Sequence, residues 1–192
     1  MKKLFLLCII LISTTSAFSQ SFFDRLHFGL KAGANYSDFN NANFETEGLV
    51  GFHAGAIVAF DINKSFSIQE EFLFSTQGAK LKGALSNEKD LKLSYISVPI
   101  VLKYKTKFGL YIEAGPQFGI LASENFKAIT SDKFGEKIDA GVVGGIGYQL
   151  PNGLGIGARY YMGLTDVSKI KSTTINTDFQ NNTAQVSLFY IF

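Results

Sequence analysis

Eight segments of the chain alternate apolar and polar residues with a period of two, and this pattern constrains the fold more than any other feature. Period two is the spacing of a β-strand, whose successive side chains point to opposite faces of the sheet. In the first segment, for example, Phe28 and Leu30 lie on one face and Lys31 lies on the other. The pattern predicts an all-β fold with strands near 27–36, 49–61, 66–77, 91–104, 109–121, 138–150, 154–164 and 183–192.

The connections between these segments alternate strictly between long and short. Four are long and polar, at 37–48, 78–90, 122–137 and 165–182. The other three are short turns, at 63–65, 106–108 and 151–153. Transmembrane β-barrels have short turns on the periplasmic side and longer loops on the outside, with an even number of strands. The connections therefore favour antiparallel pairing of neighbouring strands, and they place the start of the first strand and the end of the last strand on the same side of the membrane.

The two faces of the segments also fit a barrel in a bilayer. A tilted strand needs about 9–11 residues to cross the hydrocarbon region, and hydrocarbon cannot satisfy an open strand edge, so the sheet must close. Aromatic residues near strand ends on the apolar face fit the girdles seen at membrane interfaces: Tyr36, Phe60, Phe66, Phe74, Tyr104, Tyr148, Tyr160 and Tyr190. We therefore expect an eight-stranded antiparallel up-and-down transmembrane β-barrel.

A soluble lipocalin-like ligand binder is the distant structural alternative. Such a barrel also has eight strands, but it encloses an apolar cavity and shows its polar face to water. Alternation alone does not decide between the two arrangements. A glycine-rich outer face would be a poor soluble surface, which favours the membrane barrel.

The N-terminus has the pattern of a cleavable export signal. Lys2 and Lys3 precede an apolar run over 4–12, and small residues follow over 13–19. As a helix, nine apolar residues would span about 13 Å, whereas a bilayer core is about 30 Å thick. The pattern predicts a signal peptide over 1–19, a barrel domain over 20–192 and a location in the cell outer membrane.

Removal of the signal would leave a neutral chain without cysteine. Two of the 18 basic residues and none of the 16 acidic ones lie in 1–19, so 16 of each remain. This balance gives no case for nucleic-acid binding. Cys8, the only cysteine, lies inside the signal, which excludes thiol catalysis and cysteine metal sites in the rest of the chain.

Charged residues on the polar face are the candidate site. Charges inside a barrel are expected to pair, because an unpaired buried charge is costly. We expect an interior salt-bridge network centred on Glu71, Lys103, Glu113 and Arg159, within the larger set Lys31, Asp61, Glu71, Lys103, Glu113 and Arg159. The plainer interpretation, that these side chains only fill the narrow lumen of an eight-stranded barrel, is favoured.

No residues predict catalysis, a cofactor or a metal site. The two histidines, His27 and His53, stand without a serine–histidine motif, and a base needs a positioned nucleophile. Carboxylate pairs in the long connections could bind calcium weakly, although solvated loop charges are commoner: Glu45 with Glu47, and Asp132 with Glu136.

Five strings, in order along the chain, resemble the PorT-type outer-membrane β-barrel family of Bacteroidota. They are GLKAGAN at 29–35, EFLFSTQG at 71–78, YISVPIVLKY at 95–104, YIEAGPQ at 111–117, and GGIGY at 144–148 with ARYYMGL at 158–164. Gln77 stands where the family often has lysine. The resemblance implies a membrane barrel of the porin family. It does not imply one activity, although some PorT-like members are tied to protein secretion.

The sequence thus favours a non-catalytic barrel in contact with outer-membrane lipid. Its role would be structural in the envelope, or limited passage of small solutes, because eight strands leave little open lumen. The alternative is a binding or secretion-associated module that holds a protein partner or small ligand at the long loops, especially 122–137 and 165–182. A barrel enzyme ranks third.

Overall fold

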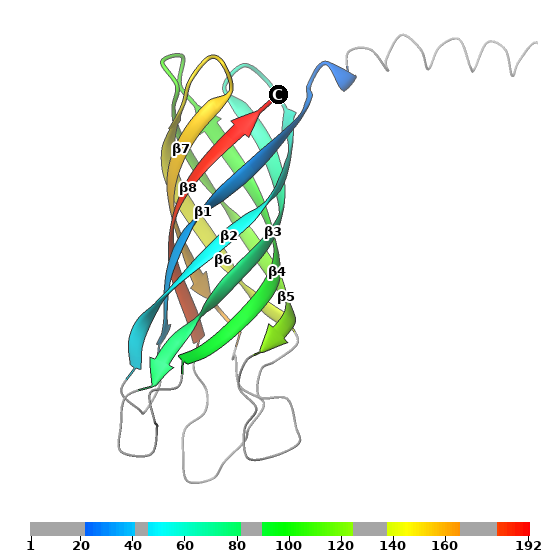
Figure 1. Cartoon of the computed structure of the whole chain (residues 1–192). Helices are drawn as coiled ribbons and strands as arrows, with labels where there is room; N and C mark the ends of the chain where they lie inside the picture. The colour runs from blue at the N-terminus through cyan, green and yellow to red at the C-terminus, as the bar shows by residue number, and fades with distance from the viewer. Residues whose placement is uncertain (1–21, 41–45, 82–89, 125–137, 166–179) are drawn as a thin grey trace, which may run out of the picture.

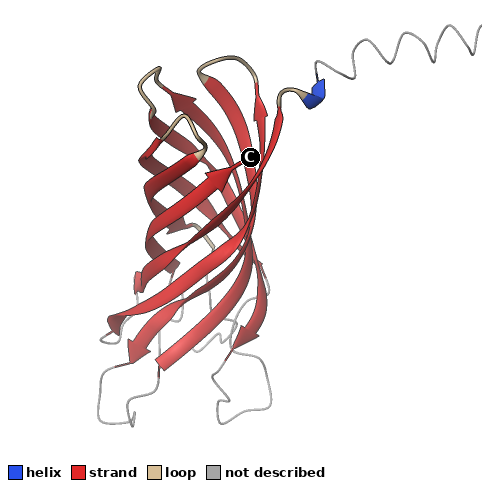
Figure 2. Ribbon diagram, turned by 45° about the horizontal axis from the view of Figure 1, so that its top comes forward, coloured by secondary structure: helices blue, strands red, loops and turns tan. Residues whose placement is uncertain are grey.

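The chain folds into one closed antiparallel barrel of eight strands joined in sequence order (Figures 1 and 2). The computed structural model describes residues 22–40, 46–81, 90–124, 138–165 and 180–192. The strands are β1 (Leu26–Asn40), β2 (Thr46–Asp61), β3 (Phe66–Leu81), β4 (Asp90–Lys105), β5 (Leu110–Glu124), β6 (Ile138–Gln149), β7 (Leu154–Gly163) and β8 (Gln180–Ile191). β1 pairs with β8, which closes the sheet. The predicted fold class is confirmed.

The three short turns lie at one end of the barrel, together with the start of β1 and the end of β8 (Figure 1). We call this the short-turn end and the opposite one the long-loop end. Gly109 and Gly153 have φ of 98° and 92° in two of these turns, a conformation that glycine adopts without steric cost. In the third turn, the Asn63 side-chain oxygen accepts hydrogen bonds from the backbone N–H of Ser65 and Phe66. The turn residues therefore fix the register of these hairpins.

Several strands extend further toward the long-loop end than the alternation predicts. β1, β2, β3, β5 and β8 each gain three or four residues there, so the connections are shorter than expected. The hydrophobic alternation fades in these extensions because outward-facing positions are polar, as at Asp38 and Asn182. The backbone ladder does not depend on side-chain polarity and continues past the apolar band.

The apolar face of the sheet points outward and the polar face points into the lumen. Phe28 and Leu30 are 54% and 59% exposed, whereas Lys31, the next residue along β1, is 6% exposed. This is the reverse of the lipocalin-like arrangement, which the structure therefore contradicts. Outward aromatic residues form pairs on this face: Phe66–Tyr104 lies at the short-turn end, and Phe52–Phe74 lies nearer the middle of β2 and β3. No helix among the described residues is long and apolar enough to cross a membrane.

Glycines on β6 and β7 make room for aromatic rings inside the lumen. Tyr111 lies against Gly147 and Gly157, and the Phe189 ring lies against Gly155. A Cβ atom added at Gly155 would be 2.2 Å from that ring, far inside van der Waals contact. The inward glycines therefore let large side chains fill an eight-stranded lumen without widening it.

Substitution of Gly155 by valine is expected to destabilise the barrel by about 1–3 kcal/mol, because the added methyl groups would overpack the Phe189 ring. The measurement is urea unfolding of the refolded protein in detergent micelles. Gly144→Val is the matched control, since a Cβ at Gly144 meets no atom nearer than 4.0 Å. Equal unfolding free energies for the two variants would contradict the packing argument.

Candidate functional site in the barrel lumen

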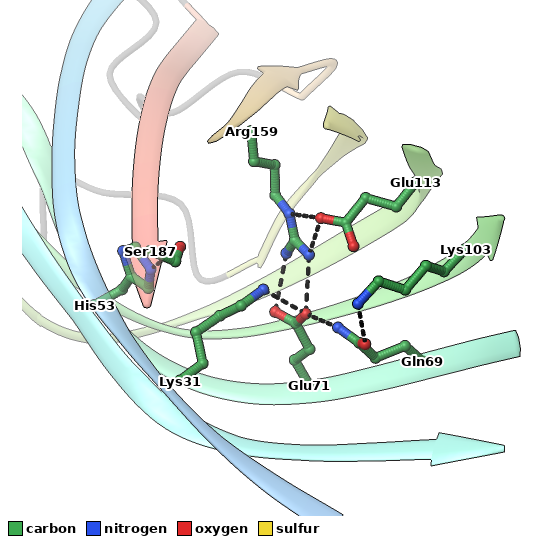
Figure 3. A network of polar contacts seen from close by, with 8 residues as sticks. All are labelled: Lys31, His53, Gln69, Glu71, Lys103, Glu113, Arg159 and Ser187. Atoms are coloured by element: carbon green, nitrogen blue, oxygen red, sulfur yellow. Dashed lines mark hydrogen bonds and ion pairs between the residues drawn. The ribbon is translucent and has the colours of Figure 1, made fainter. Parts of the chain in front are cut away.

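Four charged side chains from alternate strands meet in the middle of the lumen (Figure 3). Lys31 comes from β1, Glu71 from β3, Glu113 from β5 and Arg159 from β7. Each stands at an inward position of its strand, because the period of two sends every second side chain into the lumen. We call these four residues the central charge cluster.

Arg159 joins the two carboxylates of the cluster. Its Nη1 and Nη2 atoms donate to the Glu71 oxygens Oε2 and Oε1, each at 2.9 Å. Its Nε and Nη2 atoms donate to Glu113 Oε1 at 2.9 and 2.6 Å. Lys31 Nζ donates to Glu71 Oε1 at 2.6 Å. A planar guanidinium can bridge two carboxylates in this way, whereas a lysine ammonium acts as a point charge.

The central charge cluster is buried and internally neutral. All four residues are at most 6% exposed, and two positive charges face two negative charges. Buried charges are tolerated when they are paired and hydrogen-bonded. Glu71 is fully engaged through both oxygens, whereas Glu113 Oε2 has no hydrogen-bond partner. Glu71 is therefore the carboxylate on which the cluster depends most.

Lys103 was expected at the centre of the network, but it lies beside the cluster. Lys103 Nζ donates to Gln69 Oε1 at 3.2 Å and lies 3.9 and 4.7 Å from the ring centroids of Tyr111 and Phe189. Gln69 Nε2 in turn donates to Glu71 Oε1 at 2.5 Å. Lys103 thus reaches the cluster only through Gln69. Sequence reasoning missed Gln69, although it precedes Glu71 by two positions on the same face.

Asp61 lies apart from the central charge cluster. It is the last residue of β2, at the short-turn end, and its side chain is 47% exposed. Its Oδ2 atom lies 3.2 Å from His27 Nε2. The alternation gives the face of a strand residue but not its depth, and Asp61 lies at the rim rather than at the level of Glu71.

A hydrogen-bonded polar group lies inside the lumen on the long-loop side of the cluster. His53 Nε2 lies 2.8 Å from Ser187 Oγ, and His53 Nδ1 lies 2.6 Å from Asn35 Oδ1. Sequence reasoning missed this serine–histidine contact because 134 residues separate the two. A hydrolase uses the same order of groups, but all three side chains are at most 5% exposed. A substrate could not reach Ser187, so we interpret the group as lumen packing.

The candidate calcium ligands of the long connections, Glu45, Glu47, Asp132 and Glu136, have side chains outside the described residues. Within the part of the chain that the structure describes, no three histidine, cysteine or carboxylate side chains group as metal ligands would. The expected signal peptide over 1–19 also lies outside the described residues.

Comparisons with known proteins agree with this geometry. Neisserial surface protein A is 18% identical, with a TM-score of 0.57 over 86% of this chain and 97% of that one. The outer membrane protein OprG from Pseudomonas aeruginosa is 11% identical, with a TM-score of 0.53 over 86% and 95%. No curated protein sequence matches. The model of the outer membrane protein beta-barrel domain matches residues 18–169, most of the chain, and the protein therefore belongs to this family of outer-membrane barrels.

Proposed function

We propose that this protein is a non-catalytic barrel with a structural role in the envelope and a lumen that the central charge cluster seals. The observation that carries the proposal is the meeting of Lys31, Glu71, Glu113 and Arg159 from four alternate strands. Their contacts of 2.6–2.9 Å leave no space for a hydrated solute between them. Free passage of solutes would require the cluster to open.

The layers on either side of the cluster support the same role. On the long-loop side, His53 of β2 joins Asn35 of β1 and Ser187 of β8 inside the lumen. On the short-turn side, the rings of Tyr111 and Phe189 pack edge to face with centroids 5.9 Å apart. A solute would have to displace three successive layers, so any permeation is limited to slow, transient events.

We further infer that the chain is a PorT-type member from a Bacteroidota species, exported by the signal over 1–19. The short-turn end would then face the periplasm. The five family-like strings support this assignment, because their inward residues include Lys31, Glu71, Lys103, Glu113 and Arg159. The strings that resemble the family are thus the ones that build the polar lumen.

Conductance in planar bilayers tests the sealed lumen. The wild-type protein is expected to give no steady open state, because the cluster fills the aqueous path. The double variant Lys31→Ser/Glu71→Ser removes one positive and one negative charge together, and Arg159 keeps its contacts with Glu113. We expect this variant to give measurable steady conductance.

The control for this experiment is the double variant His27→Ser/Asp61→Ser. It also removes two side chains that contact each other, but these lie at the half-exposed rim and not in the central charge cluster. Its conductance is expected to match that of the wild type. A stable open state in the wild-type protein would overturn the proposal.

A second candidate function is binding at the long loops. The polar outward positions Asp38 and Asn182 are paired in register, beyond the apolar band. β1 has 15 residues and β3 has 16, more than the roughly 9–11 that a tilted strand needs to span the bilayer. Such strands would hold the loops outside the lipid headgroup region. Loops that a rigid scaffold presents in this way often bind a partner. Loss of cell-surface binding after replacement of 125–137 and 166–179 by short glycine-serine turns would support this function.

A further inference from the structure

The short-turn end of the barrel opens into a cavity of about 560 Å³. We call it the short-turn vestibule. Its inner end is formed by Gln69 and Lys103, and its rim includes Lys105, Lys107 and Gln149. The volume lies within the range of about 300–1,000 Å³ that is usual for small-molecule sites. The vestibule lies on the opposite side of the central charge cluster from the long loops, so it is separate from a loop-mediated site.

Lys103 has no ion-pair partner among the carboxylates that the structure describes. The two carboxylates nearest to it in the lumen, Glu71 and Glu113, are joined to Lys31 and Arg159. Among the described residues, no carboxylate oxygen forms an ion pair with Lys103, which is only 3% exposed. Three buried cations thus face two buried carboxylates in this part of the lumen, and Lys103 is the one left over. A buried charge without a counterion is costly.

The surroundings of Lys103 stabilise a cation but leave a place for an anion. An ammonium has three N–H donors, and within the described part of the chain Lys103 Nζ has one hydrogen-bond acceptor, Gln69 Oε1. The rings of Tyr111 and Phe189 attract the charge through their faces. The remaining donor capacity of Nζ is unused by the protein, and Lys103 lines the vestibule.

The rim adds to the positive potential. Lys105 and Lys107 both line the vestibule, and Lys105 Nζ donates a hydrogen bond to the uncharged Gln149 side chain, at 3.5 Å. The acidic side chain among the lining residues, Asp61, is in contact with His27. Three lysine side chains thus oppose one acidic side chain among the residues that line this partly enclosed space, an arrangement that attracts anions. The exposed side chain of Phe108, in the turn between β4 and β5, also lines the vestibule.

We propose that the short-turn vestibule binds a small organic anion whose phosphate or carboxylate group accepts a hydrogen bond from Lys103. This inference goes beyond the sealed lumen, because a ligand held on one side of the cluster need not cross the barrel. The same chemistry could come from a free solute or from the headgroup of an anionic lipid.

Calorimetric titration with phenyl phosphate tests the site, with the full protein in nanodiscs of zwitterionic lipid. The wild type is expected to bind with a dissociation constant at or below about 1 mM. Lys103→Met is expected to weaken binding at least about tenfold through loss of a charge-assisted hydrogen bond. Lys64→Met is the charge-matched control, since Lys64 lies in a turn at the same end but does not line the vestibule. Its affinity should equal that of the wild type.

A second measurement does not depend on whether Lys103→Met folds. In the wild type, phenyl phosphate should shift the amide resonances of Gly109 and Gly153, which line the vestibule, and leave that of Asn181 at the other end unchanged. Competition by anionic lipid in the nanodisc would identify a headgroup as the source of the anion, and its absence would identify a free solute. Absence of wild-type binding at millimolar phenyl phosphate, or undiminished binding by folded Lys103→Met, would overturn the proposal.

Discussion

Replacement of Glu71 by glutamine is expected to lower the free energy of unfolding by about 3–5 kcal/mol, the cost of removing one partner from a buried ion pair. Glu71 accepts hydrogen bonds from Lys31, Gln69 and Arg159 through its two carboxylate oxygens. A glutamine side chain keeps the volume but has one acceptor oxygen, and its NH₂ group would point toward donors. Lys31 would then be a buried cation without a carboxylate. Urea unfolding of the protein refolded into micelles measures the loss.

Two further carboxylates of the chain turn this prediction into a graded series. Glu113→Gln should lower the free energy of unfolding less than Glu71→Gln does. Of the two Glu113 oxygens, Oε1 is the one that is hydrogen-bonded, and Arg159 would keep its ion pair with Glu71. Asp61→Asn should cost no more than about 1 kcal/mol, as is usual for exposed ion pairs, since the Asp61 side chain is 47% exposed. The order Glu71, Glu113, Asp61 follows from burial and contacts alone. Equal losses at all three positions would contradict it.

The period-two pattern was sufficient to predict the barrel, because it reports the one physical constraint that every strand shares. Each strand has one face in contact with lipid and one in the lumen, so alternation marks all eight. The same reasoning explains where the prediction of strand ends failed. At Asp38 and Asn182, the outward positions are polar, and the sequence signal disappears while the β1–β8 ladder continues.

The candidate site was predicted less completely, because alternation gives the face of a residue and not its depth. Lys31, Glu71, Glu113 and Arg159 lie at one level, whereas Asp61 lies at the rim. Depth depends on the stagger between strands. For example, Gly29 on β1 pairs with Ile57 on β2 and with Ile191 on β8. No local sequence signal specifies this stagger, and the contact of His53 with Ser187 was missed for the same reason.

Substitution of Arg159 by alanine is expected to destabilise the barrel at least as much as Glu71→Gln. Arg159 donates hydrogen bonds to both Glu71 and Glu113. Without it, Lys31 would be the one cation among the described residues that still forms an ion pair with these two buried carboxylates. Truncation would also leave a cavity, which carries its own cost. Arg159→Lys should recover part of the loss, because an ammonium restores the charge but cannot reproduce the fork that spans two carboxylates.

A double-variant cycle separates this ionic contribution from the cavity. In the Arg159→Ala background, Glu71→Gln removes a carboxylate that no longer has its arginine, so its cost should fall or change sign relative to the wild-type background. Residues in direct contact commonly couple by about 0.5–3 kcal/mol, and we expect a value in the upper part of that range for a pair with two hydrogen bonds of 2.9 Å. Cavity formation alone would give additive losses. Additive unfolding free energies would therefore mean that the cluster fills the lumen by volume and that its charge pairing contributes little to stability.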